Sequence, residues 1–426
     1  MTSAREVARR VLVRVEEGAY SNLVLPEALR RTRLAARDRA FATDLVYGTL
    51  RAQRRLDARL APHTRRPLDE LDPPARAVLR LGAYQLERGV AAHAAVGETV
   101  AVAPAAARGY VNAVLRALAA SGPPWPAPAT DGEALSYPDW MVGRLDADLG
   151  ADRARAALLA QNEPPRLTLR PRRGRSDAAS VAAELRAAGA TVAPGALVAD
   201  ALAVRGIGDP RAVAAVAEGR ATPQDEASQA VVALVDPQPG DRVLDVAAAP
   251  GGKSTGLGER LTTGGVVAVD VHPGRLALVA AAARRLGLET VHPVLADARA
   301  LPVAPATVDR ALVDAPCSGL GVLRRRPEAR WRRTEPSAEL VRLQRALLTH
   351  AAACVRPGGR LVYSVCTLTR AETRAVVDAA LDELAGTFAA GPPPGRPWEP
   401  WGSGALLLPQ AAGTDGMFVA VLERRR

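Results

Sequence analysis

The chain has 426 residues, with 56 Lys plus Arg against 45 Asp plus Glu, so its net charge is +11 and its pI about 10.5. This length exceeds one typical domain, and the basic balance favours a polyanionic partner. We expect no signal peptide and no membrane span, because the first residues lack an apolar run with a cleavage site and no stretch of about 20 apolar residues occurs. The cysteines (Cys317, Cys354 and Cys366) are too few for a disulfide framework, and none has metal-site spacing, so we expect a cytoplasmic protein without metal.

Residues 1–120 predict an all-helical domain. Apolar residues recur at helical spacing at Val7, Val11 and Val15, and the same spacing returns around Leu45 and Leu79. This stretch holds 20 arginines against 12 acidic residues, which gives it a net charge of +8. A helical domain this basic favours an RNA-binding surface. The alternative is a scaffold whose charged surface is only solvated.

A proline-rich break, SGPPWPAPAT at 121–130, predicts a linker. The segment Tyr137-Pro138-Asp139-Trp140 is then expected to lead into one helix that continues to about residue 162. The pattern then changes to two strands alternating with two helices, at 167–170, 177–188, 197–204 and 209–217. This predicts a small α+β module. It carries a basic stretch that we expect to form an RNA-contacting loop, with Arg170, Arg172, Arg173 and Arg175.

From residue 236 onward, strand-like and helical patterns alternate regularly, which predicts a doubly wound, mostly parallel sheet. The expected strands are 243–246, 266–270, 291–296, 311–314, 360–365 and 417–422. We therefore expect four parts: an all-α RNA-binding domain, a linker with a helix, an α+β RNA-contacting module and a catalytic domain, at 1–122, 123–163, 164–235 and 236–426.

The first of these strands leads into a turn of small residues, AAAPGG at 247–252, and a helix is expected to open at residue 254. Glycines let a ligand approach the backbone closely, and N–H groups at the start of a helix face it, so the turn favours a nucleotide-like ligand. Its spacing is neither GxxxxGK[ST] nor GxGxxG, and the alternative is a plain strand-to-helix turn. Lys253 is the only lysine in the chain, which favours a compact point charge at this turn.

Polar residues stand at the ends of the following strands: Asp270, Asp297, Asp314 and Cys366. Ligands of doubly wound sheets bind at the carboxyl ends of the strands. Asp270 comes about 20 residues after the glycine turn, where a carboxylate can accept from ribose hydroxyls. Any one of these residues could be an ordinary strand-end polar group, but together they predict a site on one sheet edge.

Three segments carry a resemblance to a known family: VLDVAAAPGGKS (243–254), DAPCSGLGVLRRRPEARW (314–331) and LVYSVCTLTRAE (361–372). They resemble the first, fourth and sixth motifs of the NOL/NOP/Sun family of S-adenosylmethionine-dependent RNA cytosine-C5 methyltransferases. DRAFATDLVYGTLR (38–51) and YVNAVLRAL (110–118) are similar to the NusB-like domain of its bacterial 16S rRNA branch, the Sun/Fmu or RsmB type. The resemblance implies a Rossmann-like methyltransferase domain preceded by an all-α NusB-like domain.

The family chemistry explains the need for two cysteines. Carbon 5 of cytosine is a poor nucleophile, and addition of a thiolate to carbon 6 makes it electron-rich enough to attack a methyl group. The resemblance implies that Cys366 is the nucleophile, that Cys317 assists release and that Asp314 hydrogen-bonds the cytosine edge. Cys354 shares a helical stripe with Leu347 and Ala351, so we expect it in the core.

The resemblance also implies the binding site for S-adenosylmethionine. The residues assigned to it are Ala247, Ala248, Ala249, Pro250, Gly251, Gly252, Lys253, Asp270, Arg275, Asp297 and Asp314. The target cytosine must leave its stack to reach this pocket. Six arginines follow the fourth motif, and we expect them to contact phosphates unless they are only a solvated run: Arg324, Arg325, Arg326, Arg330, Arg332 and Arg333.

The expected substrate is 16S rRNA, free or in an early small-subunit particle, and the expected oligomeric state is a monomer. Three alternatives remain open. The chain could methylate tRNA, or it could be a non-catalytic NusB-like RNA-binding or antitermination protein. It could also be a DNA cytosine methyltransferase, in which the cysteine of a Pro-Cys pair such as Pro316-Cys317 is the nucleophile.

Overall fold

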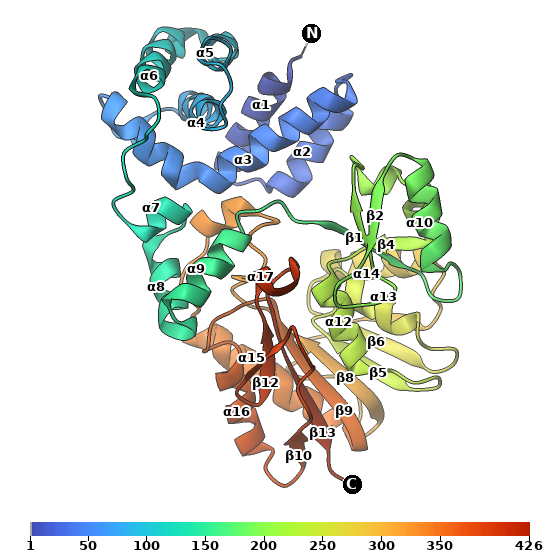
Figure 1. Ribbon diagram of the computed structural model, residues 1–426. Coiled ribbons are helices and arrows are strands. Elements are labelled where there is room, and N and C mark those ends of the chain that lie inside the picture. Colours follow the sequence, from blue (N-terminus) through green and yellow to red (C-terminus); the bar gives the residue numbers. More distant parts are fainter. Residues whose placement is uncertain (1) are drawn as a thin grey trace. The chain divides into compact units, whose positions relative to one another are not determined.

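The computed structural model describes residues 2–426, and it divides into two compact units (Figure 1). Unit 1 contains the chain up to Pro164 together with Leu323–Arg333, and unit 2 contains Pro165–Val322 and Thr334–Arg426. Unit 1 is therefore built from two separate stretches of sequence. We call Leu323–Arg333 the arginine strap, because it holds the six arginines that follow the fourth motif.

Unit 1 is all-α, as the periodicity predicts (Figure 1). Its α-helices are α1 (Ala4–Glu16), α2 (Ser21–Arg30), α3 (Ala36–Leu60), α4 (Pro73–Glu87), α5 (Ala92–Ala101), α6 (Arg108–Ser121), α7 (Asp131–Leu135), α8 (Asp139–Leu149) and α9 (Ala151–Ala160). The strap adds the 3₁₀ helix η5 (Pro327–Trp331). The long helix α3 packs against α1 and α4, and the core includes Val7, Val11, Leu45, Val46 and Leu79.

The single helix expected from Tyr137–Trp140 to about residue 162 is wrong, because this stretch forms two helices, α8 and α9; α7, which precedes it, was not predicted. Ser136 ends α7 in the left-handed region with φ 60°, and Gly150 ends α8 with φ 86°. A glycine adopts positive φ at no steric cost, so the chain turns at Gly150 and starts a new helix.

The small module in unit 2 is a four-stranded antiparallel sheet in the order β2-β3-β1-β4. Its elements are β1 (Leu167–Pro171), α10 (Ala178–Ala187), β2 (Thr191–Pro194), β3 (Leu202–Arg205), η4 (Pro210–Ala212), α11 (Ala214–Ala217) and β4 (Ala221–Pro223). The strand expected within 197–204 starts only at Leu202, because the N–H groups of Leu197 and Val198 donate to Glu226 instead of to a strand. The helix expected at 209–217 is split at Val213, and β2 and β4 are additional strands.

The large sheet of unit 2 runs β11-β12-β13-β9-β8-β5-β6-β7, and β10 pairs with β13. The strands are β5 (Arg242–Val246), β6 (Gly265–Asp270), β7 (Val291–Leu295), β8 (Val308–Asp314), β9 (Val355–Val365), β10 (Phe388–Ala390), β11 (Glu399–Trp401), β12 (Gly404–Leu407) and β13 (Met417–Arg424). Strands β5 to β9 are parallel, whereas β10 to β13 pair antiparallel. The predicted doubly wound, mostly parallel sheet is confirmed.

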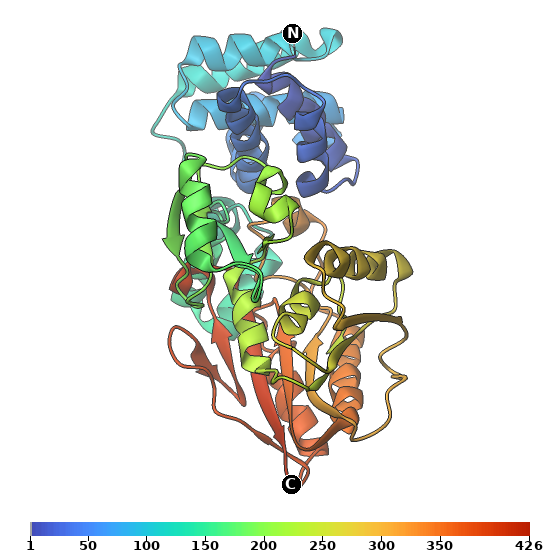
Figure 2. The ribbon, with the colours of Figure 1, turned by 90° about the vertical axis from the view of Figure 1, so that its right-hand side faces the viewer.

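Helices lie on both faces of this sheet (Figures 1 and 2). They are α12 (Glu226–Val235), α13 (Gly252–Gly258), α14 (Pro273–Leu286), α15 (Ala338–Cys354), α16 (Arg374–Glu383) and the short α17 (Pro409–Ala412). The strand order runs from β5 through β6 to β7 in one direction, and β8 starts again on the other side of β5. This reversal is a topological switch point, so a crevice is expected beyond the carboxyl ends of β5 and β8.

Candidate active site

The turn after β5 is shaped by its small residues. Ala247 has φ 58° and Gly251 has φ 98°. A side chain at Gly251 would place its Cβ 2.9 Å from Cα of Val279, so this position requires glycine for space as well as for φ. The N–H of Ala248 donates to the carbonyl oxygen of Val269 at 3.0 Å, which ties the turn to β6. The result is a narrow backbone loop at the switch point.

Two of the predicted cofactor residues brace this loop from outside. Asp270 is 4% exposed, and its carboxylate accepts from the N–H groups of Ala249 at 3.1 Å and His272 at 2.9 Å. Arg275 donates to the carbonyl oxygen of Ala249 at 3.0 Å. Asp270 therefore holds the N–H of Ala249, and Arg275 holds its carbonyl oxygen.

The only lysine of the chain is Lys253 in α13, and its ammonium group reaches Asp314 at the carboxyl end of β8. Nζ of Lys253 is 2.6 Å from Oδ2 of Asp314, and the other carboxylate oxygen of Asp314 accepts from Oγ of Ser364 at 3.0 Å. Burial alone would lower the pKa of Lys253, but the Asp314 carboxylate outweighs it, so the pKa is raised. Lys253 is thus a protonated ammonium that holds Asp314 in place.

The two predicted catalytic cysteines meet, although 49 positions separate them in the sequence. Their sulfur atoms are 3.3 Å apart, and both side chains are partly exposed. Cys317 follows β8 in an irregular loop, and Cys366 follows β9 directly. The carbonyl oxygen of Cys366 accepts from the N–H of Gly321 at 2.9 Å, so the two loops are also joined through their backbones.

The hydrogen bond between the cysteines makes them chemically unequal. The hydrogen bond with Cys317 lowers the pKa of Cys366, against the opposing effects of burial and of the Asp314 carboxylate, and the Lys253 ammonium adds to the lowering. The same hydrogen bond, together with burial, raises the pKa of Cys317 well above its ordinary value. Cys366 is therefore the more available thiolate, and Cys317 keeps its proton.

A buried carboxyl group under the loop was not singled out in the sequence. Asp245 in β5 is fully buried, and Ser254 donates to it at 2.6 Å. Burial raises the pKa of Asp245 to about 7, and its Oδ1 has no hydrogen-bond partner among the described residues. The sequence contains an indication of this residue, because an aspartate within the apolar run VLDV is unusual for a strand that only packs in the core.

Three family models match separate parts of the chain: the NusB family at 2–120, the RsmF/B-like ferredoxin-like domain at 137–209 and the 16S rRNA methyltransferase RsmB/F at 232–423. A probable ribosomal RNA small subunit methyltransferase B from Bacillus subtilis is 33% identical over 447 residues, covering 100% of this chain and 99% of the relative. The chain belongs to the RsmB/F family of 16S rRNA methyltransferases.

Other members of the RsmB/F family and solved structures agree with this assignment. The ribosomal RNA small subunit methyltransferase B of Thermus thermophilus is 37% identical, covering 99% of this chain and 97% of the relative. The crystal structure of PH0851 has a TM-score of 0.84 at 27% identity and covers 99% of this chain and 98% of its own. A methyltransferase homologue from Pyrococcus horikoshii has a TM-score of 0.59 at 25% identity, covering 69% of this chain and 97% of its own.

Asp297, predicted as one of the S-adenosylmethionine residues, forms a surface pair with Arg299 at 2.6 Å. Hydrogen bonds from the Arg299 side chain and backbone lower the pKa of Asp297 to about 2.

Cys354 is 4% exposed, and its thiol donates to the carbonyl oxygen of His350 at 3.6 Å, which confirms its prediction as a core residue. Among residues 2–426, no group of three or more His, Cys, Asp or Glu side chains is arranged to hold a metal ion.

The expected phosphate role is wrong for Arg330, which is fully buried inside unit 1. Its guanidinium lies 3.8 Å from the ring centroid of Tyr137. It donates to the carbonyl oxygens of Arg51 at 3.1 Å, Ser136 at 3.2 Å and Gln161 at 3.2 Å. Arg330 therefore anchors the strap in the helical unit and is not available to RNA.

The other strap arginines divide in the same way. Arg324 is 3% exposed, so the phosphate role is wrong for it too. Arg332 donates to the carbonyl oxygens of Gly18 at 2.9 Å and Ala19 at 2.8 Å, which follow α1. Arg326, Arg332 and Arg333 are exposed, and Arg325 is partly exposed. Residue type alone did not separate the buried arginines from the exposed ones.

Arg170, expected in a basic surface loop, is instead a buried residue of β1 with 8% exposure. It donates to the carbonyl oxygen of Gly252 at 2.8 Å and to Oγ1 of Thr255 at 3.0 Å, and it pairs with Glu259 at 2.9 Å. The RNA-contacting expectation is therefore wrong for Arg170, which supports α13. Arg173 and Arg175 are exposed.

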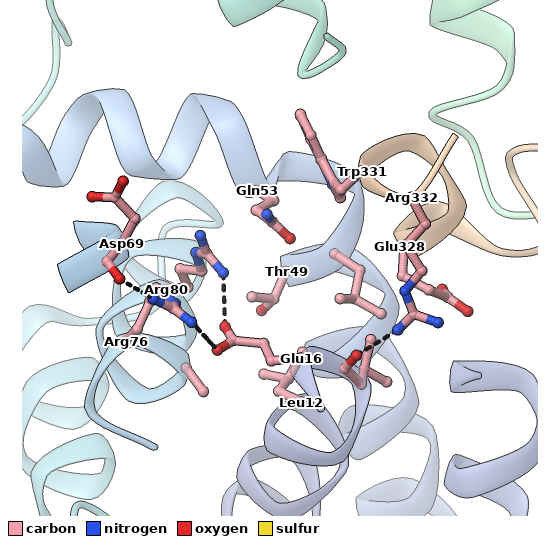
Figure 3. A pocket seen from close by; sticks show the side chains of 13 residues that line it. Leu12, Glu16, Thr49, Gln53, Asp69, Arg76, Arg80, Glu328, Trp331 and Arg332 are labelled. Atoms are coloured by element: carbon pink, nitrogen blue, oxygen red, sulfur yellow. Dashed lines mark hydrogen bonds and ion pairs between the residues drawn. The ribbon is translucent and has the colours of Figure 1, made fainter. Parts of the chain in front are cut away.

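Unit 1 also contains a cavity of about 430 Å³ (Figure 3). Arg76 and Arg80 point toward Glu16 on one side, and each lies 2.8 Å from a carboxylate oxygen of Glu16. The strap forms another part of the lining through Glu328 and Trp331. The lining contains none of the predicted catalytic or cofactor residues, all of which belong to unit 2. No helix within residues 2–426 combines the length and apolar character needed to cross a bilayer.

Proposed function

We propose that this protein methylates carbon 5 of a cytosine in 16S rRNA, with S-adenosylmethionine as the methyl donor and Cys366 as the covalent nucleophile. The observation that carries the proposal is the pair of sulfur atoms 3.3 Å apart, with opposite pKa shifts, on the sheet edge that also holds Asp314 and Lys253. Membership of the RsmB/F family and relatives named ribosomal RNA small subunit methyltransferase B support the RNA substrate.

The residues around the loop fit S-adenosylmethionine. The turn at 247–252 consists of alanine, proline and glycine and so has no long side chain, and buried Oδ1 of Asp245 is a hydrogen-bond acceptor without a partner in the described residues. The residues that would hold the cofactor are those from Ala247 to Lys253 together with Asp270, Arg275, Asp297 and Asp314. When bound, the cofactor supplies a sulfonium methyl group that carbon 5 of the base can attack.

Cys366 begins the reaction. Its thiolate adds to carbon 6 of the flipped cytosine, and the electron pair of the carbon 5–carbon 6 double bond becomes available at carbon 5. Asp314 would hydrogen-bond the cytosine edge, and Lys253 and Ser364 hold it through its two oxygens. The Lys253 ammonium also favours the thiolate form of Cys366 before attack.

Cys317 completes the reaction. Once the sulfur of Cys366 is bonded to carbon 6, it no longer carries the negative charge that raises the pKa of Cys317. Cys317 therefore becomes easier to deprotonate at the stage when a base must remove the proton from carbon 5. Loss of that proton restores the double bond and expels the Cys366 thiolate. Cys317 thus keeps its proton while Cys366 attacks, and it releases that proton to solvent before its thiolate takes the proton from carbon 5.

Bisulfite sequencing of 16S rRNA from a deletion strain tests the function. We expect one cytosine to lose its resistance to conversion and to regain it when the wild-type gene, but not Cys366→Ala, is returned. tRNA and DNA from the same strains serve as controls. A change confined to tRNA or DNA would assign the chain to one of those substrates, and no change in any nucleic acid would contradict methyl transfer.

A further inference from the structure

The residues that follow the two cysteines are joined through one buried carboxylate. Glu372 is fully buried. Its Oε1 accepts from the backbone N–H of Ser318 at 2.7 Å, and its Oε2 accepts from the hydroxyl of the same residue at 2.5 Å. Ser318 follows Cys317 directly. The loop that carries Cys317 is therefore held at two atoms of the next residue.

The loop that carries Cys366 is tied to the same carboxylate. Thr367, which follows Cys366, places its hydroxyl 3.2 Å from Oε2 of Glu372 and 2.7 Å from the hydroxyl of Ser318. Thr369 donates to Oε2 of Glu372 at 2.8 Å. All four side chains are buried. Ser318 and Thr367 therefore contact each other, just as Cys317 and Cys366, which directly precede them, contact each other.

A second side chain holds the residue before Cys317. Gln344 of α15 is fully buried and donates through Nε2 to the carbonyl oxygen of Pro316 at 2.9 Å and to Oε1 of Glu372 at 3.1 Å. Cys317 therefore lies between two residues that are fixed by one connected network. We call the side chains of Glu372, Gln344, Ser318 and Thr367 the Glu372 clamp.

The two cysteines depend on this clamp to different degrees. Cys366 follows the eleven-residue strand β9 directly, so the sheet already fixes it. Cys317 lies in an irregular loop without regular secondary structure. Burying a carboxylate is costly unless its lone pairs are satisfied, and the donors around Glu372 satisfy it. Loss of the clamp should therefore move Cys317 more than Cys366.

We propose that Glu372 is a positioning residue that holds the Cys317 sulfur against the reacting centre and thereby sets the rate of product release. This inference rests on the proposed function. Proton removal by Cys317 needs hydrogen-bond reach to carbon 5, and a misplacement of about 1 Å can cost about 100-fold in rate. Capture of the cytosine by Cys366 does not need Cys317 in that position.

The charge of Glu372 also acts on Cys317 electrostatically. After the effects of Cys366 and of burial, the Glu372 carboxylate contributes to the raised pKa of Cys317. The other titratable groups coupled to the cysteine pair are Tyr363, Asp314, Lys253 and Asp415. Neutralising Glu372 should therefore lower the pKa of Cys317 and move the pH dependence of release to lower pH.

The experiment compares full-length wild type with Glu372→Gln. Each protein is mixed with S-adenosylmethionine and deproteinised 16S rRNA from a deletion strain, quenched in detergent at a series of times, and resolved by denaturing electrophoresis. We expect the Glu372→Gln adduct to form within about threefold of the wild-type rate and to decay about 10- to 100-fold more slowly. Its affinity for S-adenosylmethionine, measured by calorimetry, should be unchanged.

Two further variants make the result decisive. Glu383→Gln alters an exposed carboxylate at the end of α16 that pairs with Arg345, and it should match wild type. Thr367→Val removes one hydroxyl without changing charge, so it should slow release about 10-fold without moving the pH profile. It also tests the clamp if Glu372→Gln does not fold.

The outcomes separate the two hypotheses. Adduct lifetimes within twofold of wild type in both Thr367→Val and folded Glu372→Gln would overturn the positioning role while leaving the methyl transfer intact. A wild-type protein that forms no adduct and transfers no methyl group to the RNA would instead overturn the proposed function. An unchanged pH profile in Glu372→Gln would remove the electrostatic part of the proposal.

Discussion

Residues 315–322 and the arginine strap are consecutive in sequence, yet they belong to different units of the structure. The first stretch presents Cys317 at a sheet edge and is held by a polar network. In the strap, by contrast, the side chain of Arg330 is fully buried and packs on the ring of Tyr137. The comparison shows that cysteine, a reactive residue type, pointed to the candidate site in the sequence, whereas the arginines of the strap did not point reliably to an RNA-binding surface.

The two units also treat buried charge differently. Burial lowers the pKa of Arg330 to about 10, so it stays protonated at neutral pH, with three backbone carbonyls as acceptors. Burial raises the pKa of Asp245 to about 7, so this carboxyl group is protonated in a large fraction of molecules at neutral pH. Arg330 therefore keeps its charge when it is buried, whereas Asp245 gives up part of its charge.

The largest expected effect concerns the two cysteines. Cys366→Ala should abolish methyl transfer, because carbon 5 is never activated without the thiolate. Cys317→Ala keeps the nucleophile, so a covalent protein–RNA adduct should accumulate and survive denaturing electrophoresis. An adduct with Cys366→Ala and none with Cys317→Ala would show that the roles are reversed, as in the Pro-Cys mechanism.

The next effect is the pH dependence of stability through Asp245. Its pKa is raised from the model-peptide value of 3.8 to about 7 on folding, so the folded protein binds more protons than the unfolded chain between these values. Stability from this group is therefore complete below pH 4 and is lost as the pH rises to about 7, by about 4 kcal/mol at most.

Asp245→Asn removes this titration and keeps an acceptor for Ser254. The free energy of unfolding of the variant, measured in urea at pH 4 and at pH 8, should rise relative to wild type between the two. Equal differences from wild type at both pH values would contradict the buried titration.

A smaller effect is expected in the strap. Arg330→Met removes the guanidinium and leaves buried carbonyl oxygens without donors, so the free energy of unfolding should fall by about 3 kcal/mol. Arg333→Ala, at an exposed position, should change it by less than about 0.5 kcal/mol. Urea unfolding followed by tryptophan fluorescence measures both. Similar losses in the two variants would mean that burial does not distinguish the strap arginines.

The sequence alone predicted the class of fold, which the structure confirms, and the residues of a candidate site, whose chemistry stays a prediction. Helical spacing at Val7 and Val11, alternating strands and helices, and the small-residue turn are local patterns, and local patterns survive in any arrangement of the rest. The cysteines were recognised because thiol chemistry is rare and their motifs are specific. Their predicted roles stay predictions until the variants are measured.

Only the tertiary structure decided which polar residues are buried and what they hold. In the sequence Arg170 and Arg330 look like surface arginines, because their partners are distant in the chain: backbone oxygens for Arg330, and a backbone oxygen, Thr255 and Glu259 for Arg170. The sequence does not distinguish Glu372 from the other acidic residues. Its role follows from its hydrogen bonds with Ser318, Gln344 and Thr367. Burial and hydrogen-bond partners depend on segments that are distant in sequence, and a single chain read in order contains no local signal for them.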